Sequence, residues 1–534
     1  MSILQGFLVC MIYYLANSTL VGVGFFTFSK PLVAGFFTGL ILGDPVLGTQ
    51  IGAAINLLYI GNISAGGTMP SDSTLAAIVG VTLGVNAGLS VEAALALAVP
   101  IGLLGTLLWF GRLTVNTSFV ALADRYAQEG KAEKFWVINV LLPQSLLFLI
   151  SAVPCFIIVY FGIDYVSGLI SFLGQNVLGI LIVVGGMLPA LGLGLTLKSI
   201  YHGDAKVYFF LGFFLIQYFG LDMISLGIMS LIITIMYIQF KRDKKEENEQ
   251  KEAISDGHEF RKSSGLITKG DLIRSSLIWC FHAQGCYNYE RMQGIGFTHA
   301  MVPAFKRFYK DGSPEMAAAM QRHMGFFNTA PQFAAMIPGL AVAMEEQIYM
   351  GVDGIDEASI TAIKTSLMGP LSGIGDTVCQ GVIVPLLLSF FIGMSMEGNV
   401  LGPILYTIII SIVIFGMNHF SYMLGYNKGS SAILALLESG LINKIIDGAK
   451  VMGCIVIGGL IAKYVSVKTG IVITSGETVF DLQTQLFDVI IPGLLPLLTT
   501  FGCYKLIDKG ISTTRVMLII VVVGIIGGFF KILV

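Results

Sequence analysis

The sequence has few charged residues. Only 12% of its 534 residues are Asp, Glu, Lys or Arg, whereas 55% are hydrophobic. Soluble globular domains carry about 25% charged residues, so this composition excludes an ordinary soluble enzyme and indicates an integral membrane protein. The formal net charge of −2 gives no polybasic surface, and we therefore expect no nucleic-acid partner.

Motifs for common catalytic and metal chemistry are also missing. The sequence contains no G-x-x-x-x-G-K-[ST], H-E-x-x-H or G-x-S-x-G motif. Its seven cysteines lack C-x-x-C spacing and its six histidines are dispersed, so we interpret the cysteines as apolar core residues. The sequence therefore predicts no metal site, no cofactor and no catalytic residue of its own. These absences favour a polytopic transporter whose energy source lies in another protein.

Long apolar runs are present, but they are uneven. About 20 apolar residues are needed to cross a bilayer, and four runs come close to that length: 138–162, 176–197, 401–418 and 515–534. Three others are interrupted by glycine, proline or polar residues: 31–42, 46–60 and 368–376. Such interruptions are typical of discontinuous helices around a transport site, although kinked packing helices also contain Gly and Pro. We predict an all-α polytopic membrane protein with broken or re-entrant helices.

One polar stretch, 61–74, stands between two of these apolar runs. It contains three glycines, a proline, several hydroxyls and Asp72. Irregular backbone at membrane depth persists only where it is buried in protein or lines a watery cavity, and an ionisable group there indicates a functional site. The alternative is an extramembrane loop that ends in a helix N-cap at Ser71 or Asp72.

A charged segment divides the chain into two membrane modules. Residues 241–262 are rich in Lys, Arg and Glu and have too few apolar residues to fold alone. Their Lys/Arg content places them in the cytoplasm. We predict a first membrane domain at 1–240, a cytoplasmic linker at 241–265 and a second membrane domain at 266–534.

Shorter patterns predict local structure around these modules. Two basic loops, 124–134 and 306–323, are expected on the cytoplasmic side. Thr268 to Asp271 forms a capping box, and Ser313 before Pro314 is typical of a helix start. A stretch rich in Val, Thr and Ile at 463–488 predicts a small hairpin outside the bilayer.

A membrane site for a neutral polyol needs amide, carboxylate and hydroxyl groups to replace the hydrogen bonds that the ligand gives up to water. Such groups gather at the interrupted segments and in the polar stretch 284–293. The alternative for 284–293 is an interfacial helix with an Arg–Glu pair. The candidate substrate-binding residues are Asp44, Asn56, Thr68, Asp72, Gln284, Asn288, Glu290, Gln293 and Asp376.

These residues carry a family resemblance. Residues 1–240 resemble the IIC membrane subunit of the mannose-family (mannose/fructose/sorbose) sugar phosphotransferase system, through Leu42-Gly43-Asp44, Gly-x-x-Ile-Asn56 and the stretch 61–72. Residues 266–534 resemble the IID subunit of that system. The matching IID stretches are 284–297, 301–303, 322–329, 345–347, 363–376 and 492–496.

The resemblance implies a sugar importer in a bacterial inner or plasma membrane. IIC and IID of this family form one multi-pass membrane unit, which assembles as a trimer and binds an extracellular hexose or hexose derivative. A cytoplasmic IIB subunit, charged by IIA, then phosphorylates the sugar. The phosphohistidines belong to IIA and IIB, so whether this chain counts as an enzyme is left open.

Two departures and one alternative class accompany the resemblance. IIC and IID are usually separate chains, whereas here they are joined. Asn56 stands where mannose-type members have glutamate, which weakens the expectation that mannose itself is the substrate. An ion-coupled secondary sugar transporter would instead use Asp72, Glu290 or Asp376 to carry protons. A membrane receptor for toxins or phage would be a side role.

Overall fold

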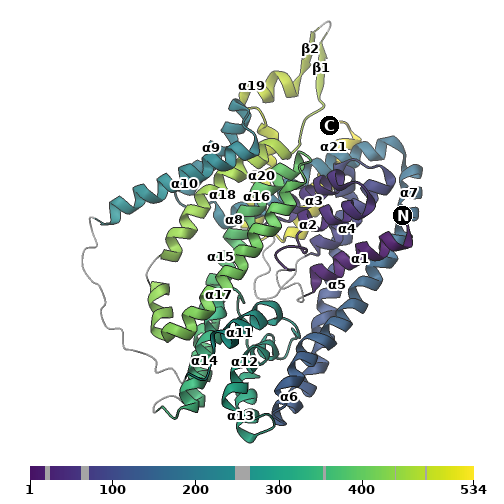
Figure 1. The fold of residues 1–534 in the computed structure, drawn as a ribbon. Helices are drawn as coiled ribbons and strands as arrows, with labels where there is room; N and C mark the ends of the chain where they lie inside the picture. The colour runs from purple at the N-terminus through teal and green to yellow at the C-terminus, as the bar shows by residue number, and fades with distance from the viewer. Residues whose placement is uncertain (19–23, 62–70, 247–264, 353–355, 439–440, 476–477) are drawn as a thin grey trace.

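The computed structural model describes residues 1–18, 24–61, 71–246, 265–352, 356–438, 441–475 and 478–534, and it is almost entirely helical (Figure 1). The first half contributes α1 (Ile3–Asn17), α2 (Pro31–Leu42), α3 (Pro45–Tyr59), α4 (Ser73–Ala87), α5 (Val91–Asn116), α6 (Val120–Gln128), α7 (Leu142–Met187), α8 (Pro189–Ile200), α9 (Ala205–Phe219) and α10 (Met223–Glu246). The candidate residue Thr68 lies outside the described residues.

The second half is helical with one small hairpin. Its helices are α11 (Lys269–His282), α12 (Gly294–Phe308), α13 (Pro314–His323), α14 (Met336–Tyr349), α15 (Glu357–Val378), α16 (Val384–Met396), α17 (Leu401–Glu438), α18 (Leu441–Tyr464), α19 (Asp488–Ile490), α20 (Leu494–Asp508) and α21 (Thr513–Phe529). Antiparallel strands β1 (Val472–Ser475) and β2 (Thr478–Asp481) form the hairpin. The predicted hairpin is therefore confirmed, as are the Thr268 capping box and the Ser313 N-cap.

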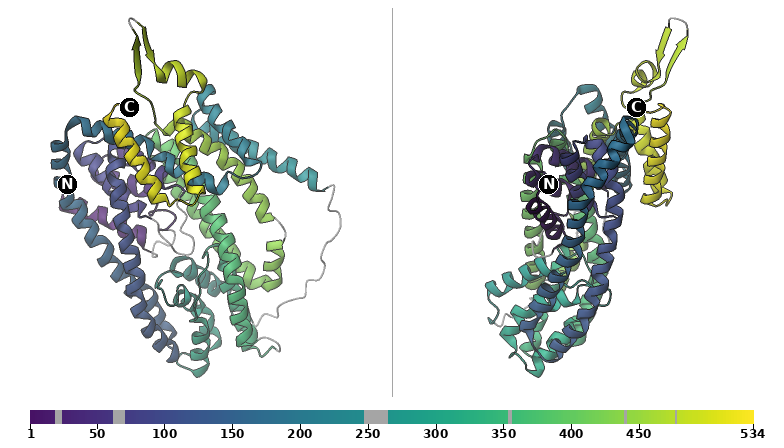
Figure 2. Two further views of the ribbon diagram at one scale, coloured as in Figure 1. Left: turned by 180° about the vertical axis from the view of Figure 1, so that it is seen from behind. Right: turned by 90° about the vertical axis from the view of Figure 1, so that its right-hand side faces the viewer.

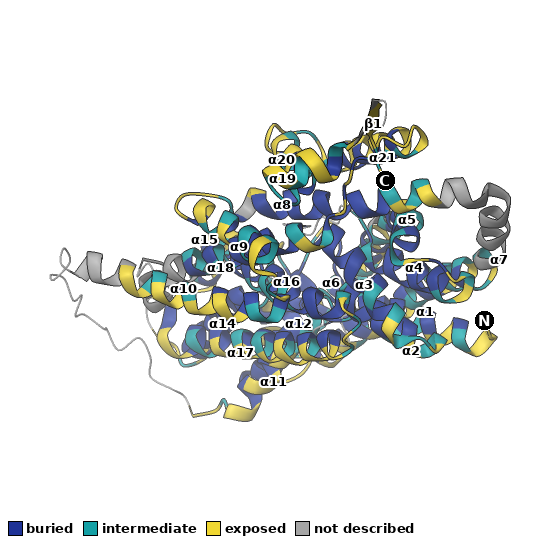
Figure 3. Cartoon of the chain, turned by 90° about the horizontal axis from the view of Figure 1, so that it is seen from above, coloured by how far each residue is buried: buried dark blue, intermediate teal, exposed yellow. Residues whose placement is uncertain are grey.

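Five of the described helical segments are long and apolar enough to cross a membrane: Ala132–Gly162, Gly179–Lys198, Met223–Phe240, Glu357–Met396 and Leu401–Gly429. The pair Gln483–Ile490 and Leu494–Asp508 passes the same test but is bent by 65°. Exposed apolar side chains follow the outer faces of α10 and α17, whereas buried residues gather where α3 packs against α4 and against α16 (Figure 3). The prediction of a polytopic all-α protein with broken helices is confirmed.

Helices α2 and α3 form a short, closely packed pair. α2 has 12 residues and is about 18 Å long, so it is shorter than the roughly 30 Å apolar core of a bilayer. It ends at Gly43, whose φ is +98°, as is typical of a helix C-terminus. A Cβ on Gly35 would lie 2.6 Å from the Gly52 Cα, and one on Gly39 would lie 2.7 Å from the Gly48 Cα. These facing G-x-x-x-G sequences let the two backbones touch.

The predicted interruption at 368–376 is wrong. α15 continues through Gly369, Pro370 and Gly373 to Val378, and a π-helical turn, η6 (Cys379–Ile383), joins it to α16. A membrane helix tolerates an internal proline where neighbouring groups satisfy the freed carbonyl. The irregularity therefore lies just after Asp376, instead of before it.

The two halves of the chain interlock. α9 packs on α18, α3 on α16, α8 on α20 and α7 on α21, so helices from both halves lie side by side in every view (Figures 1 and 2). A Cβ on Gly212 of α9 would collide with the Ile455 carbonyl of α18, and one on Gly458 would lie 2.1 Å from the Phe209 carbonyl oxygen. The α9–α18 contact thus depends on backbone touching backbone.

The two ends of the molecule are formed by different elements. α6 lies beside α13 at one end, where the Gly312 N–H donates to the Gly130 carbonyl at 3.1 Å. The β1–β2 hairpin lies at the opposite end (Figure 1). The two basic loops expected on one side of the membrane therefore share one end of the fold.

Candidate binding site

A cavity of about 160 Å³ lies between the two halves. One water needs about 10–15 Å³ on this scale, so the cavity has room for roughly ten waters or a ligand of comparable bulk. The first half lines it from the segments around α1, α2, α3, α4 and α5. The second half lines it from the end of α11, the loop 328–332 and α15.

Four of the predicted site residues line this cavity: Asn56, Asp72, Gln284 and Asp376. They come from both halves of the chain and lie up to 320 positions apart in the sequence. Four others do not line it: Asp44, Asn288, Glu290 and Gln293. The structure therefore brings together one group of candidates and separates it from the rest.

Asp72 is a buried N-cap at the cavity wall. Its Oδ1 accepts a hydrogen bond from the Leu75 N–H at 2.8 Å, and its Oδ2 accepts one from the Tyr13 hydroxyl at 2.5 Å. The residue is only 5% exposed. The N-cap that was predicted as the alternative is thus present, and the same carboxylate also faces a buried cavity.

The side-chain amide of Asn56 is hydrogen-bonded through its oxygen, and its NH₂ group remains available as a donor. Its Oδ1 accepts from the Leu32 N–H at 3.1 Å, at the first turn of α2. Among the described residues, its Nδ2 group has no hydrogen-bond acceptor, so it can donate to a ligand. In the second half, the Asp376 Oδ1 accepts from the Gln380 amide at 3.0 Å.

Gln293 supports the cavity wall from behind. Its Nε2 donates to the Thr329 carbonyl at 2.8 Å, and its Oε1 accepts from the Thr329 N–H at 3.1 Å. Thr329 belongs to the loop 328–332, which lines the cavity. Gln293 is therefore placed as a positioning residue for this loop.

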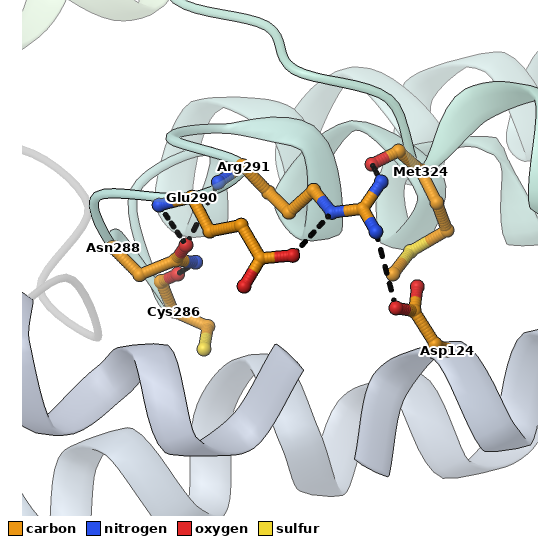
Figure 4. A network of polar contacts seen from close by, with 6 residues as sticks. All are labelled: Asp124, Cys286, Asn288, Glu290, Arg291 and Met324. Atoms are coloured by element: carbon orange, nitrogen blue, oxygen red, sulfur yellow. Dashed lines mark hydrogen bonds and ion pairs between the residues drawn. The ribbon is translucent and has the colours of Figure 1, made fainter. Parts of the chain in front are cut away.

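Asn288, Glu290 and Arg291 form a separate polar cluster (Figure 4). The Asn288 Oδ1 accepts from the N–H groups of residues 290 and 291 at 3.0 and 2.9 Å, and its Nδ2 donates to the Cys286 carbonyl, as in an Asx turn. Arg291 pairs with Glu290 at 3.4 Å and with Asp124 of α6 at 3.1 Å. The Arg–Glu pair that was predicted as the alternative is present, and the cluster connects the two halves.

Asp44 has a capping role on another helix. Its Oδ1 accepts from the Leu47 N–H at 2.9 Å, at the start of α3. Both Asp44 and Asp72 thus begin a helix, but only Asp72 does so at the cavity.

Three asparagine and arginine side chains of the first half hold the loop that carries Gln284. Arg112 donates to the Gln284 carbonyl at 3.2 Å, and Asn116 donates to the Tyr287 carbonyl at 3.0 Å. Asn139, in the π-helical turn η4 (Val137–Leu141), donates to the His282 carbonyl at 2.9 Å and accepts from the Cys286 N–H at 3.0 Å. The second-half wall of the cavity is therefore positioned by first-half side chains.

Among the cavity residues that the sequence reasoning missed are Lys30, Tyr59 and Arg112. Lys30 and Arg112 are cations beside or within apolar runs, and that placement was a usable signal. Tyr59 offered no signal in the sequence. Its buried hydroxyl has no hydrogen-bond partner among the described residues.

Gly105→Ala is expected to weaken ligand binding roughly tenfold or more, because the geometry of a charged hydrogen-bonding group would change. A Cβ at this position in α5 would lie 2.4 Å from the Asp72 Cβ and 2.8 Å from its Oδ2. The matched control is Gly111→Ala in the same helix, where a Cβ meets nothing within 4 Å. Equal ligand affinity in the two purified variants would contradict the assigned position of Asp72.

The long apolar helices and the cavity between the two halves define a polytopic membrane protein. Comparison with known families agrees: residues 266–533 match the PTS system mannose/fructose/sorbose family IID component, and residues 3–236 match the PTS system sorbose-specific IIC component. The chain therefore belongs to the mannose/fructose/sorbose family of phosphotransferase-system membrane components, with a IIC half followed by a IID half.

Individual relatives match each half separately. The mannose-specific EIID component of Escherichia coli K12 is 37% identical over 265 residues, which covers 48% of this chain and 91% of that protein. The mannose-specific EIIC component of the same strain is 28% identical over 218 residues, covering 40% of this chain and 80% of that protein. A solved structure described as a membrane protein is 35% identical, covers 50% of this chain and 98% of its own, and has a TM-score of 0.46.

Proposed function

We propose that this chain is the translocation unit of a phosphoenolpyruvate-dependent sugar phosphotransferase system. It would bind an extracellular hexose or hexose derivative and release it inside after a separate IIB subunit has phosphorylated it. Membership of the family supports a role in sugar transport. The observation that supports sugar binding is the cavity between the halves, which is lined by carboxylates, amides and hydroxyls.

The chemistry of the cavity suits a neutral polyol. Carboxylate oxygens of Asp72 and Asp376 would accept hydrogen bonds from sugar hydroxyls, and the Asn56 amide would donate to sugar oxygens. Each such group replaces a hydrogen bond that the sugar loses on leaving water. The proposed sugar-binding residues also include Asp44, Thr68, Gln284, Asn288, Glu290 and Gln293. Thr68 lies outside the described residues, and of the other five only Gln284 lines the cavity.

We infer that IIB docks at the end of the molecule formed by α6 and α13. Exposed cations gather there: Arg125, Lys131, Lys134, Lys306 and Lys310. In this arrangement the linker 241–265 is cytoplasmic and the β1–β2 hairpin faces outward. Lys134→Glu with Lys310→Glu is expected to raise the IIB concentration needed for half-maximal uptake by roughly tenfold. The charge reversal Arg515→Glu, at an exposed position of α21, should have no effect, and loss of sugar binding in the double variant would argue against docking.

The family resemblance also supports a homotrimer in a bacterial inner or plasma membrane. The exposed apolar faces of α10 and α17 are available for lipid or for a neighbouring copy. Light scattering on the purified protein would test this, and a monomer would contradict it.

The function is tested by uptake into proteoliposomes. Vesicles would contain this chain and, inside, phosphoenolpyruvate, the general carrier protein, IIA and IIB. We expect uptake to require all of these soluble components and to yield sugar phosphate. Uptake of unmodified sugar driven by a proton gradient alone would instead identify an ion-coupled secondary transporter. In that case Asp72, Glu290 and Asp376 would be the proton-carrying candidates.

A further inference from the structure

Asn328 is a half-buried amide residue in the second-half wall of the cavity. It begins the loop 328–332 and lines the cavity. Its Oδ1 accepts a hydrogen bond from the Tyr287 hydroxyl at 2.8 Å. The oxygen side of the amide is therefore engaged within the protein, and the NH₂ group is the side that remains for other partners.

The NH₂ group of Asn328 has accessible surface. It donates to no acceptor among the described residues, and it is not one of the fully buried side-chain atoms that lack a partner. The Nε of Arg112 and the hydroxyl of Tyr59 also lack a hydrogen-bond partner in the described part of the chain, but these two atoms are fully buried. Of these three unpaired donors, only the Asn328 amide can therefore reach a ligand.

Tyr287 is itself held firmly in place. The residue is only 1% exposed, and its carbonyl accepts from the Asn116 amide of α5 at 3.0 Å. The centre of its ring lies 6.4 Å from that of Trp109, also of α5. Because backbone and ring are both fixed by the first half, the Tyr287 hydroxyl has a defined position from which it orients the Asn328 amide.

The loop of Asn328 packs directly on α15, which carries Asp376. The Asn328 N–H donates to the Met368 sulfur at 3.2 Å, and a Cβ on Gly375 would lie 2.5 Å from the Ala330 Cβ. Asp376 follows Gly375 and lines the same cavity. One wall of the cavity thus offers an amide donor and a carboxylate acceptor from adjoining elements. A sugar hydroxyl both donates and accepts, so such a wall suits a polyol.

We propose that Asn328 is a substrate-binding residue whose NH₂ group donates to one oxygen of the sugar. Tyr287 is the positioning residue that keeps the amide in this orientation. Asn56 offers a matching donor in the first half, since its oxygen is likewise engaged, by the Leu32 N–H. This inference rests on the proposed function and adds a residue of the second half that recognises an acceptor atom of a hexose.

The test measures ligand affinity of the purified full chain by calorimetry in nanodiscs. The ligand is whichever of mannose, fructose and sorbose binds, with analogues in which one hydroxyl at a time is replaced by hydrogen or fluorine. Hydrogen removes the acceptor, whereas fluorine remains a weak acceptor and cannot donate. At one hydroxyl position, Asn328→Ala should weaken binding of the parent sugar about 3- to 10-fold, as expected for one neutral hydrogen bond. It should leave binding of the deoxy analogue at that position unchanged.

Two further variants test the orientation of the amide. The wild type should bind the fluoro analogue at that position at least about threefold more tightly than the deoxy analogue. Asn328→Asp keeps an oxygen for the Tyr287 hydroxyl but replaces the NH₂ group with a second acceptor, so the preference should reverse. Tyr287→Phe removes the hydroxyl that orients the amide, so the preference should disappear. A wild-type preference in both variants would overturn the assigned orientation.

Asn399→Ala and Tyr422→Phe are the matched controls. The Asn399 Oδ1 accepts from the Leu401 N–H at 3.0 Å, the Tyr422 hydroxyl bonds to Ser275 at 2.6 Å, and neither residue lines the cavity. Both variants should keep the wild-type order of affinities. An unchanged parent affinity in Asn328→Ala, or an equal loss for the parent and every deoxy analogue, overturns the inference. Phosphoenolpyruvate-dependent uptake by the wild type would then leave the proposed function intact. If none of the three sugars binds, both fail.

Discussion

Asp72→Asn is expected to lower the rate of sugar uptake roughly 10- to 100-fold, because a hydrogen bond to a charged group contributes about 1.5–3 kcal/mol. Asparagine is also a good N-cap and keeps an oxygen for the Leu75 N–H, so α4 should still form. What changes is the charge that faces the cavity beside Tyr13. Initial rates of phosphoenolpyruvate-dependent uptake, at equal amounts of assembled protein, measure the effect.

The matched control is Asp356→Asn. Asp356 is also an N-cap and accepts from the Ser359 N–H at 2.8 Å, but it is exposed at the start of α15 and does not line the cavity. Its variant should transport within about twofold of the wild type, as expected for a surface position. Equal rates in the Asp72 and Asp356 variants would remove Asp72 from the site.

Glu345→Gln is expected to lower the free energy of unfolding by about 3–5 kcal/mol, because it breaks a buried ionic network. The Glu345 side chain is fully buried and accepts from His323 at 2.9 Å and Tyr309 at 3.2 Å, with Arg322 at 3.4 Å. Burial and the nearby Lys364 ammonium lower the pKa of His323 to about 4. His323 is therefore neutral at pH 7, and Glu345 remains as the buried carboxylate that pairs with the Arg322 guanidinium.

Glu357→Gln provides the comparison for this network. Glu357 pairs with the same Arg322 at 3.1 Å, but its side chain is 64% exposed, and exposed pairs contribute only about 0–1 kcal/mol. Thermal unfolding of the purified protein should show a melting temperature lower by several degrees for Glu345→Gln and nearly unchanged for Glu357→Gln. Similar losses in both variants would show that burial does not decide the effect.

The sequence predicted the membrane class and much of the local structure, since these depend on neighbouring residues. Low charge is a property of the composition, a long apolar run can be recognised in a window of about 20 residues, and an N-cap residue acts on the first turn of its helix. The break predicted at 368–376 was wrong because Gly and Pro do not by themselves end a helix that is packed among others. The π-helical turn after Asp376 has no comparable sequence signal.

Only part of the candidate site could be predicted, because its walls come from both halves. Asp72 and Asp376 were found since carboxylates in apolar surroundings are conspicuous. Glu290 was selected by the same rule, yet it lies half-exposed beside Arg291; its role in sugar binding stays a prediction. Tyr59 can be recognised as a site residue only from the cavity that it lines, and that cavity depends on long-range packing.

The contact between α9 and α18 has a consequence for how the protein is made. α9 belongs to the first half and leaves the ribosome long before α18 exists, so the glycine face at Gly212 has no partner during that interval. A separate second chain would have to find this face by diffusion in the membrane. Covalent connection supplies it at an effective concentration in the millimolar range and always in a one-to-one ratio. Fusion thus turns an assembly step between two gene products into a step of folding.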